Sequence, residues 1–246
     1  MKIQAFIPAA GLGTRLKPLT DQRPKALVEV DGKPLLELLI EKLSAMGASP
    51  IVINVHHFGE QIVEYIESRH WNSEIRISDE RELLLDTGGG LKRAEKLLEK
   101  DLPVLIHNVD VIEHINLEAM YAQHTDNKDI ATLAVSERDT SRYLLFDPSH
   151  YLAGWHNRNT EEYLWVKEAR KDAKHLAFSG IALVEPQLLA LMPEADRPYP
   201  IIPAYLEIAK HHTINSFEHS KEDWLDVGKP ETLAIAAQKQ RLWKLS

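Results

Sequence analysis

Two hydrophobic patterns alternate along the first 110 residues. Short apolar runs, typical of buried strands, occupy residues 3–7, 51–55 and 104–106, and Ile75 and Ile77 alternate with polar neighbours. Between these runs, apolar residues recur at helical spacing over residues 35–46, 60–66 and 91–98. Strands that alternate with helices indicate right-handed βαβ units and a mainly parallel sheet. We therefore expect a Rossmann-like α/β fold, with a mainly parallel sheet flanked by helices.

Beyond Asp110 the pattern changes to strands with few long helices between them. The expected strands cover residues 130–135, 143–146, 151–155 and 177–184, and helical spacing returns over 202–210 and 230–243. This pattern favours a smaller lobe added to the sheet as a mixed or antiparallel extension. With no repeat or linker in the sequence, we expect one compact two-lobed domain over residues 1–246.

Composition narrows the class of protein. Of the 246 residues, 44% are hydrophobic and 27% charged, as in ordinary globular proteins, and none is cysteine, which excludes disulfides and thiolate metal sites. No run approaches the about 18 apolar residues of a membrane span, and no signal peptide is recognisable, so we expect a cytoplasmic protein without a membrane partner. A net charge of −8 argues against a nucleic-acid partner, but not against one small anionic ligand.

A glycine-rich stretch follows the first expected strand immediately. It contains Gly11, Gly13 and Arg15, with Lys25 further along. Ligands of open parallel sheets bind at the carboxyl ends of strands, where small residues allow close approach of the main chain and cations attract phosphate. A simple strand-to-helix turn with surface charges is the alternative. Leu16 stands where a dinucleotide fingerprint needs its third glycine, and no P-loop spacing occurs.

A carboxylate, Asp110, ends the buried run of residues 104–106 at the same predicted edge of the sheet as Gly11. A carboxylate at this place could bind Mg²⁺ against phosphates, or it could simply cap a turn.

The stretch Gly11-x-Gly13-Thr14-Arg15-Leu16-x-Pro18-x-Thr20, followed by Pro24-Lys25-x-Leu27, resembles the signature of the sugar-1-phosphate nucleotidyltransferases. The resemblance implies a glycosyltransferase-A-like fold, with a nucleotide-binding half over residues 1–110 and a sugar-phosphate-binding half over 111–246. It also implies that the nucleotide is bound around Ala9, Ala10, Gly11, Gly13 and Thr14. Arg15 and Lys25 become the catalytic residues, contacting the leaving pyrophosphate and the α-phosphate. Pro8 departs from the family's usual aliphatic residue and removes one N–H group.

Other segments match the family at lower specificity. Trp224-Leu225-Asp226-Val227-Gly228 resembles its late Trp-x-Asp-x-Gly segment, so Asp226 is expected to join Asp110 in binding Mg²⁺, although Val109 replaces a glycine before Asp110. The resemblance places the base near Thr87, Gly88 and Gly89, in a glycine-rich entry to an amphipathic helix. It places the sugar phosphate near Asn108, Ser179 and Gly180.

Within the family, the short chain most resembles the N-acetylmuramate-1-phosphate uridylyltransferases of cell-wall recycling. This implies transfer of a nucleoside monophosphate from UTP to N-acetylmuramate 1-phosphate, with pyrophosphate as the second product, by a monomer or small homo-oligomer. The Glu-Lys-Pro segment with which larger relatives contact the sugar phosphate is missing between Gly154 and Phe178, and Arg142-Tyr143-Leu144 adds bulk near the expected sugar.

Several alternatives remain open on the sequence. The same chemistry could use mannose 1-phosphate with GTP, glucose 1-phosphate with dTTP or UTP, or phosphocholine with CTP. A non-catalytic sugar-nucleotide sensor is the alternative from another class, and the full set of Arg15, Lys25, Asp110 and Asp226 argues against it. A nicotinamide-dependent enzyme is disfavoured by Leu16.

Overall fold

A computed structural model describes residues 1–243, apart from the side chain of Glu222. Residues 244–246, which the expected domain included, lie outside the described residues. The helices of four or more residues are α1 (Leu35–Ala45), α2 (Gly59–Glu67), α3 (Asp86–Ala94), α4 (Leu117–Asn127), α5 (Pro186–Leu191), α6 (Ile201–Ile208) and α7 (Pro230–Trp243). The strands are β1 (Gln4–Pro8), β2 (Glu29–Val30), β3 (Lys33–Pro34), β4 (Ile51–Val55), β5 (Ile75–Asp79), β6 (Val104–His107), β7 (Val111–Glu113), β8 (Ala131–Ser136), β9 (Arg142–Phe146), β10 (Leu152–Asn157), β11 (Glu162–Trp165), β12 (Lys174–Val184), β13 (Ile214–Glu218) and β14 (Trp224–Asp226).

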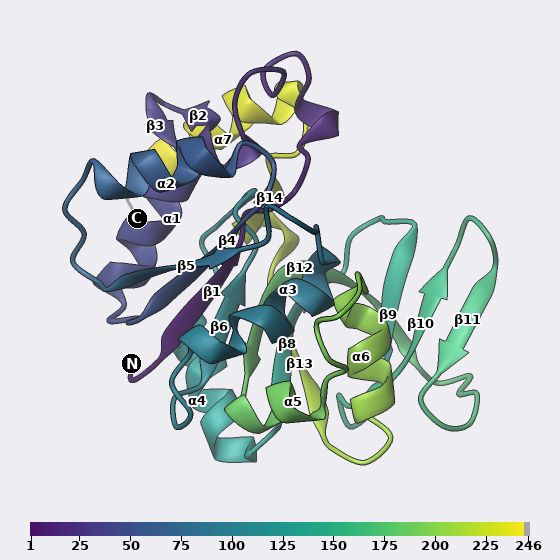
Figure 1. The fold of residues 1–246 in the computed structure, drawn as a ribbon. Coiled ribbons are helices and arrows are strands. Elements are labelled where there is room, and N and C mark those ends of the chain that lie inside the picture. Colours follow the sequence, from purple (N-terminus) through teal and green to yellow (C-terminus); the bar gives the residue numbers. More distant parts are fainter. Residues whose placement is uncertain (244–246) are drawn as a thin grey trace.

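One sheet runs through both halves of the chain (Figure 1). Its main path has the order β11-β10-β9-β12-β6-β1-β4-β5; off this path, β8 pairs with β12 and β13 pairs with β8. The pairs β6–β1, β1–β4 and β4–β5 are parallel, whereas β12 pairs antiparallel with β6, β8 and β9. The predicted mixed sheet, parallel in the first half and extended by antiparallel strands, is confirmed.

Side chains alternate across the sheet, so the central strands contribute to two hydrophobic cores. On β1, Ala5 and Ile7 pack into one core with α1, α2 and α7, while Phe6 packs into the other with α3, α5 and α6. The strand is buried on both faces, which is why its sequence reads as a continuous apolar run. Figure 1 shows the two groups of helices on either side of the sheet.

The prediction of few long helices after Asp110 missed α4. Its hydrophobic stripe is too sparse to read from sequence, because only Leu117, Met120 and His124 are buried. Asn116 caps this helix, accepting a hydrogen bond from the N–H of Ala119 at 2.9 Å. Among the described residues, no helix has the length and apolar character needed to cross a bilayer.

The glycines of residues 88–90 also lie differently from the expectation. They were predicted to precede a helix, but α3 begins at Asp86 and includes all three. Close neighbours explain glycines inside a helix: an added Cβ would lie 2.5 Å from the Tyr199 ring at Gly88 and 2.7 Å from the Glu80 carboxylate at Gly90.

Candidate active site

The loop after β1 starts at the carboxyl ends of three parallel strands. Pro8 lies opposite Asn54 on β4, and Phe6 lies opposite Ile106 on β6, so the segments that follow these strands share one edge of the sheet. Gly13 adopts a φ of +64°, and the hydroxyl of Thr20 donates to its carbonyl at 2.8 Å. The loop thereby folds back on itself, so that Gly13 lies against Thr20 and Lys25.

Four charged side chains predicted from sequence meet at this edge. Lys25 forms an ion pair with Asp110, and the Arg15 guanidinium lies 3.7 Å from the same Oδ2 atom. Arg15 also donates to Asp226 Oδ2 at 3.2 Å. We call these four residues the charge cluster. Two cations thus face two carboxylates, and Arg15 and Asp226 are 211 positions apart in the sequence.

Strand pairing brings the two carboxylates together. On the antiparallel pair β7–β14, Asp226 lies opposite Val111, and the N–H of Val227 donates to the carbonyl of Asp110 at 2.8 Å. Gly228 fits closely here, since an added Cβ would lie 2.5 Å from both Arg15 Nη2 and Asp226 Oδ1 unless the arginine moved. The glycine of the predicted Trp-x-Asp-x-Gly segment therefore leaves room for the arginine.

The residues present suit a Mg²⁺ ion. Asp226 Oδ1 is buried and has no hydrogen-bond partner among the described residues, so this atom is free to accept a cation. Within the same residues, no group of three or more His, Cys, Asp or Glu side chains could hold a metal ion by itself. Two carboxylates agree with the preference of Mg²⁺ for a few protein ligands completed by phosphate and water oxygens.

A buried polar network, which the sequence analysis missed, fixes the start of the loop after β1. Asn54 Oδ1 accepts hydrogen bonds from the N–H groups of Ala9 at 2.7 Å and Ala10 at 3.3 Å. Its amide donates at 2.7 Å to Glu80, whose other oxygen accepts from the N–H of Leu85 at 3.2 Å. Burial raises the pKa of Glu80 against these hydrogen bonds. The N–H groups of Ala9 and Ala10, which were expected to face the nucleotide, are therefore bonded to Asn54 instead. Gly11 is exposed, with open space around it, and is the position of this loop that a ligand could approach most closely.

The predicted base-side residues contact the segment before α6. The N–H groups of Gly88 and Gly89 both point to the carbonyl of Tyr199, at 2.9 and 3.3 Å. The Thr87 hydroxyl accepts from the N–H of Ile201 at 3.0 Å, at the start of α6. Of the three, only Thr87 is exposed, so it is the member of this group best placed to meet a ligand.

The predicted sugar-phosphate residues lie beside the charge cluster. The N–H of Asn108 donates to the carbonyl of Gly180 at 2.9 Å, and Gly180, at φ +73°, has the Asn108 side chain where a Cβ would stand. Ser179 is fully buried, and its hydroxyl is bonded to Arg138 at 3.0 Å and His219 at 2.7 Å. Arg138 is a further residue that the sequence analysis missed. Its signal was its place just after the predicted strand of residues 130–135.

A second carboxylate network is centred on Glu113, the last residue of β7. Glu113 is buried, and its carboxylate contacts Lys42, His107 and the N–H of Ile115. Burial alone would raise the pKa of Glu113, but the hydrogen bond with His107 and the charge of Lys42 lower it to about 2. Every oxygen of this carboxylate is engaged, in contrast to Asp226.

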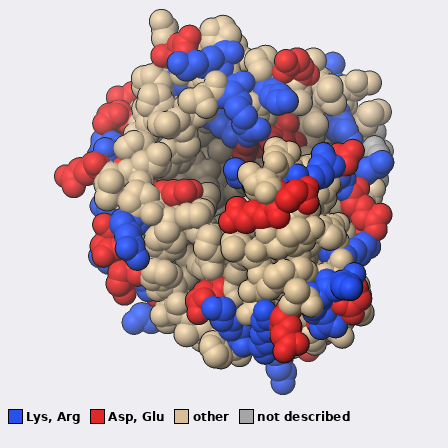
Figure 2. All heavy atoms as spheres, turned by 90° about the vertical axis from the view of Figure 1, so that its right-hand side faces the viewer, with Lys and Arg blue, Asp and Glu red and all other residues tan. Residues whose placement is uncertain are grey.

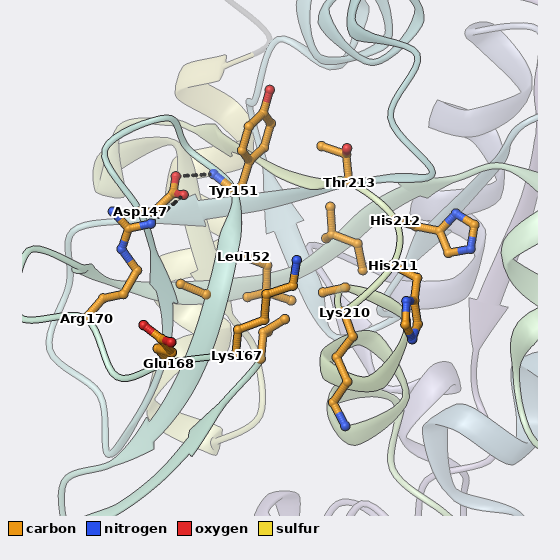
Figure 3. A pocket seen from close by; sticks show the side chains of 14 residues that line it. Asp147, Tyr151, Leu152, Lys167, Glu168, Arg170, Lys210, His211, His212 and Thr213 are labelled. Atoms are coloured by element: carbon orange, nitrogen blue, oxygen red, sulfur yellow. Dashed lines mark hydrogen bonds and ion pairs between the residues drawn. The ribbon is translucent and has the colours of Figure 1, made fainter.

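The surface offers hollows at both edges of the sheet. On the face that carries β9–β11 and α6, a hollow with Lys and Arg at its upper rim lies at the height of the loop after β1 (Figure 2). A separate cavity of about 350 Å³ lies at the opposite edge, between the β9–β10 turn and the segment after α6 (Figure 3). Its Arg170 is paired with Asp147 and Asp172.

Comparisons with known proteins agree with this geometry. The family model "Nucleotidyl transferase" matches residues 4–241. The chain is 31% identical to N-acetylmuramate alpha-1-phosphate uridylyltransferase of Caulobacter vibrioides, over 94% of each chain. It is also 31% identical to mannose-1-phosphate guanyltransferase of Aspergillus oryzae, but covers only 62% of that protein's length.

Solved structures show the same fold. HddC from Yersinia pseudotuberculosis, complexed with GMP-PN, superposes with a TM-score of 0.73 at 21% identity, covering 97% of this chain and 99% of that one. UDP-glucose pyrophosphorylase from Acinetobacter baumanii gives 0.77 at 15% identity, covering 100% of both chains. The recognition from sequence is confirmed: this chain belongs to the nucleotidyl transferase family and is a nucleotidyltransferase.

Proposed function

We propose that the protein transfers a nucleoside monophosphate from a nucleoside triphosphate to a sugar 1-phosphate, giving an NDP-sugar and pyrophosphate. The observation that carries this proposal is the charge cluster, in which Arg15 and Lys25 meet Asp110 and Asp226 at the carboxyl edge of the sheet. Two phosphorylated substrates need such cations to neutralise their charge, and the two carboxylates would bind the Mg²⁺ ion.

The reaction is an in-line displacement at phosphorus. A phosphate oxygen of the acceptor attacks the α-phosphorus, the bond to the bridging oxygen of the β-phosphate breaks, and pyrophosphate leaves with that electron pair. The nucleophile is already an anion, so no side chain has to remove a proton. Catalysis then depends on positioning and on neutralising charge.

The cluster can exchange its partners when substrates bind. Without them, Lys25 and Arg15 neutralise the two carboxylates. When bound, Mg²⁺ supplies the positive charge that these carboxylates need next to phosphate oxygens. Arg15, with a side chain 56% exposed, is then free to contact the leaving pyrophosphate, and the less mobile, 16% exposed Lys25 the α-phosphate.

For the substrates, we propose UTP and N-acetylmuramate 1-phosphate. Support comes from the uridylyltransferase of Caulobacter vibrioides, which matches this chain along nearly its whole length. GTP with mannose 1-phosphate is the second candidate, favoured by the guanyltransferase of Aspergillus oryzae. A role in cell-wall recycling and a cytoplasmic location go with the first pair and stay predictions.

A matrix of nucleotides against acceptors tests these assignments. Purified protein is mixed with UTP, GTP, CTP or dTTP and each of N-acetylmuramate 1-phosphate, mannose 1-phosphate, glucose 1-phosphate and phosphocholine, with Mg²⁺, and pyrophosphate release is measured. We expect the highest kcat/KM for UTP with N-acetylmuramate 1-phosphate. Tight nucleotide binding without pyrophosphate release in any well would overturn the proposal in favour of a sensor.

A further inference from the structure

Arg138 is a half-buried cation whose direct partners are all neutral. Its Nη1 donates to Ser136 Oγ at 2.7 Å, Ser179 Oγ at 3.0 Å and the carbonyl of Ala177 at 3.2 Å, and its Nη2 donates to the carbonyl of Phe178 at 2.6 Å. No carboxylate of the described part of the chain forms an ion pair with it. Burial lowers the pKa of Arg138 to about 10, so the guanidinium is charged at neutral pH without a contacting counter-ion.

The guanidinium lies against β14, the strand that also carries Asp226. It lies over the ring of Trp224, 3.8 Å from the ring centroid. Trp224 and Asp226 are two residues apart on this strand, so their side chains share one face. Asp226 is also the charged group that acts on Arg138 and raises its pKa against burial. Arg138 therefore lies within electrostatic reach of Asp226, a carboxylate of the charge cluster.

Part of the guanidinium has no partner. Arginine has five N–H groups, and the described residues supply acceptors only for those of Nη1 and one of Nη2. The Nε–H and the second Nη2–H remain, and these two groups form the edge with which arginine binds phosphate through two parallel hydrogen bonds. A buried charge is costly unless it is paired, so a missing anion is expected here.

We propose that Arg138 binds the phosphate of the acceptor substrate through its Nε–Nη2 edge. This inference rests on the proposed function, because the acceptor there is a phosphate monoester. Arg138 contacts Ser179 and adjoins the segment that contacts Asn108, where the acceptor phosphate was expected. It supplies a fixed cation in a chain that has no Glu-Lys-Pro segment between Gly154 and Phe178.

Arg138→Met and Arg138→Lys separate this role from bracing of the fold. The methionine keeps an apolar contact with Trp224 but removes the charge, whereas the lysine keeps the charge and removes the fork. We expect Arg138→Met to raise KM for the sugar 1-phosphate by about 10- to 100-fold, the effect of a charged hydrogen bond, and to leave KM for the nucleotide within about twofold. Arg138→Lys should fall between Arg138→Met and wild type.

Arg170→Gln is the matched control, because Arg170 is exposed and lies in the cavity at the opposite edge. Its kinetics should equal those of wild type. Titration of each variant with the sugar 1-phosphate by calorimetry gives a readout independent of turnover, and a urea unfolding curve identifies any variant that fails to fold.

The outcomes of this experiment are distinct. A selective loss of acceptor affinity in Arg138→Met that Arg138→Lys partly restores supports the proposal. Equal rises in both KM values, or a fall in kcat with unchanged acceptor affinity, would overturn it and leave Arg138 a brace for β12 and Trp224. Absence of turnover in wild type with every acceptor would refute the proposed function itself.

Discussion

Two carboxylate networks lie three residues apart in the sequence and differ in how completely they are satisfied. The side chain of Glu113 is 1% exposed, and its oxygens are shared among Lys42, His107 and a backbone N–H group. The cluster around Asp110 lies at the open edge of the sheet, where Asp226 keeps one oxygen without a partner. A saturated network stabilises the fold, whereas an incomplete one can accept new ligands. From this difference we infer that Glu113 stabilises the fold, and we propose that the cluster around Asp110 serves the chemistry.

The charge cluster gives the largest expected effect. Asp110→Ala or Arg15→Ala should lower kcat by about 10²- to 10³-fold, in line with the loss of one preorganised charge contact. Because the Arg15 side chain is exposed, the unfolding free energy of Arg15→Ala should change by less than about 1 kcal/mol. Steady-state kinetics and urea unfolding check the two parts. Near-normal turnover in both variants would refute their roles.

Glu113 should show the opposite behaviour. Glu113→Gln breaks a buried ion pair and should lower the unfolding free energy at pH 7 by about 3 kcal/mol. Because the folded pKa of Glu113, about 2, lies below its ordinary value of 4.5, the stabilisation is complete above pH 4.5 and is lost as the pH falls toward 2.

Urea unfolding of wild type and Glu113→Gln from pH 7 to pH 2 measures that loss. The two proteins should differ most at neutral pH and converge at the acid end. A constant difference across the range would show that the charge of Glu113 contributes nothing, and that only packing changed.

Asn54 links the two kinds of network, since it is buried yet fixes the loop that carries Arg15. Asn54→Ala leaves the N–H groups of Ala9 and Ala10 and the carboxylate of Glu80 without their partner. We expect a loss of about 2 kcal/mol in unfolding free energy, together with a higher KM for the nucleotide. Gln61→Ala, which removes an exposed amide hydrogen bond to Gln22, is the control and should change stability by less than about 0.5 kcal/mol. Unchanged nucleotide affinity in Asn54→Ala would show that the hydrogen bonds of Asn54 are not needed to hold the loop in its nucleotide-binding conformation.

Gly228→Ala gives the smallest of these effects. The new methyl group would stand 2.5 Å from both Arg15 Nη2 and Asp226 Oδ1, so the guanidinium has to move. A displacement of about 1 Å can cost up to 10²-fold in rate, and since Arg15 is exposed and adaptable we expect roughly a 10-fold fall in kcat. Wild-type kinetics in this variant would show that the position of Arg15 is not critical.

The sequence predicted the charge cluster but not the buried polar network of Asn54 and Glu80. Apolar runs located β1, β4 and β6, and a carboxylate directly after a buried strand pointed to Asp110. Asn54 sits within such an apolar run, and nothing in the run reveals that its partner is Glu80, 26 residues away. Periodicity reports which face of an element is buried, not which polar groups meet across the fold.

Arg138 is a second residue whose contacts across the fold could not be predicted from the sequence. It follows β8 directly, the position that drew attention to Asp110 after β6, yet a lone arginine in a charged segment reads as a surface residue. Only the packing of β12 and Trp224 around it shows that Arg138 is half-buried, and that its charge is felt by Asp226 on the same strand as Trp224.

The role of the charge cluster can be tested by following the phosphorus atoms of the reaction. Wild type and Asp110→Asn are each incubated with UTP, N-acetylmuramate 1-phosphate and Mg²⁺, and the mixtures are monitored by ³¹P NMR. We expect wild type to form one UDP-sugar and one pyrophosphate for each UTP consumed, while Asp110→Asn, folded to the same extent, forms neither at a comparable rate. Equal conversion by the two proteins would contradict the assignment of the chemistry to the charge cluster.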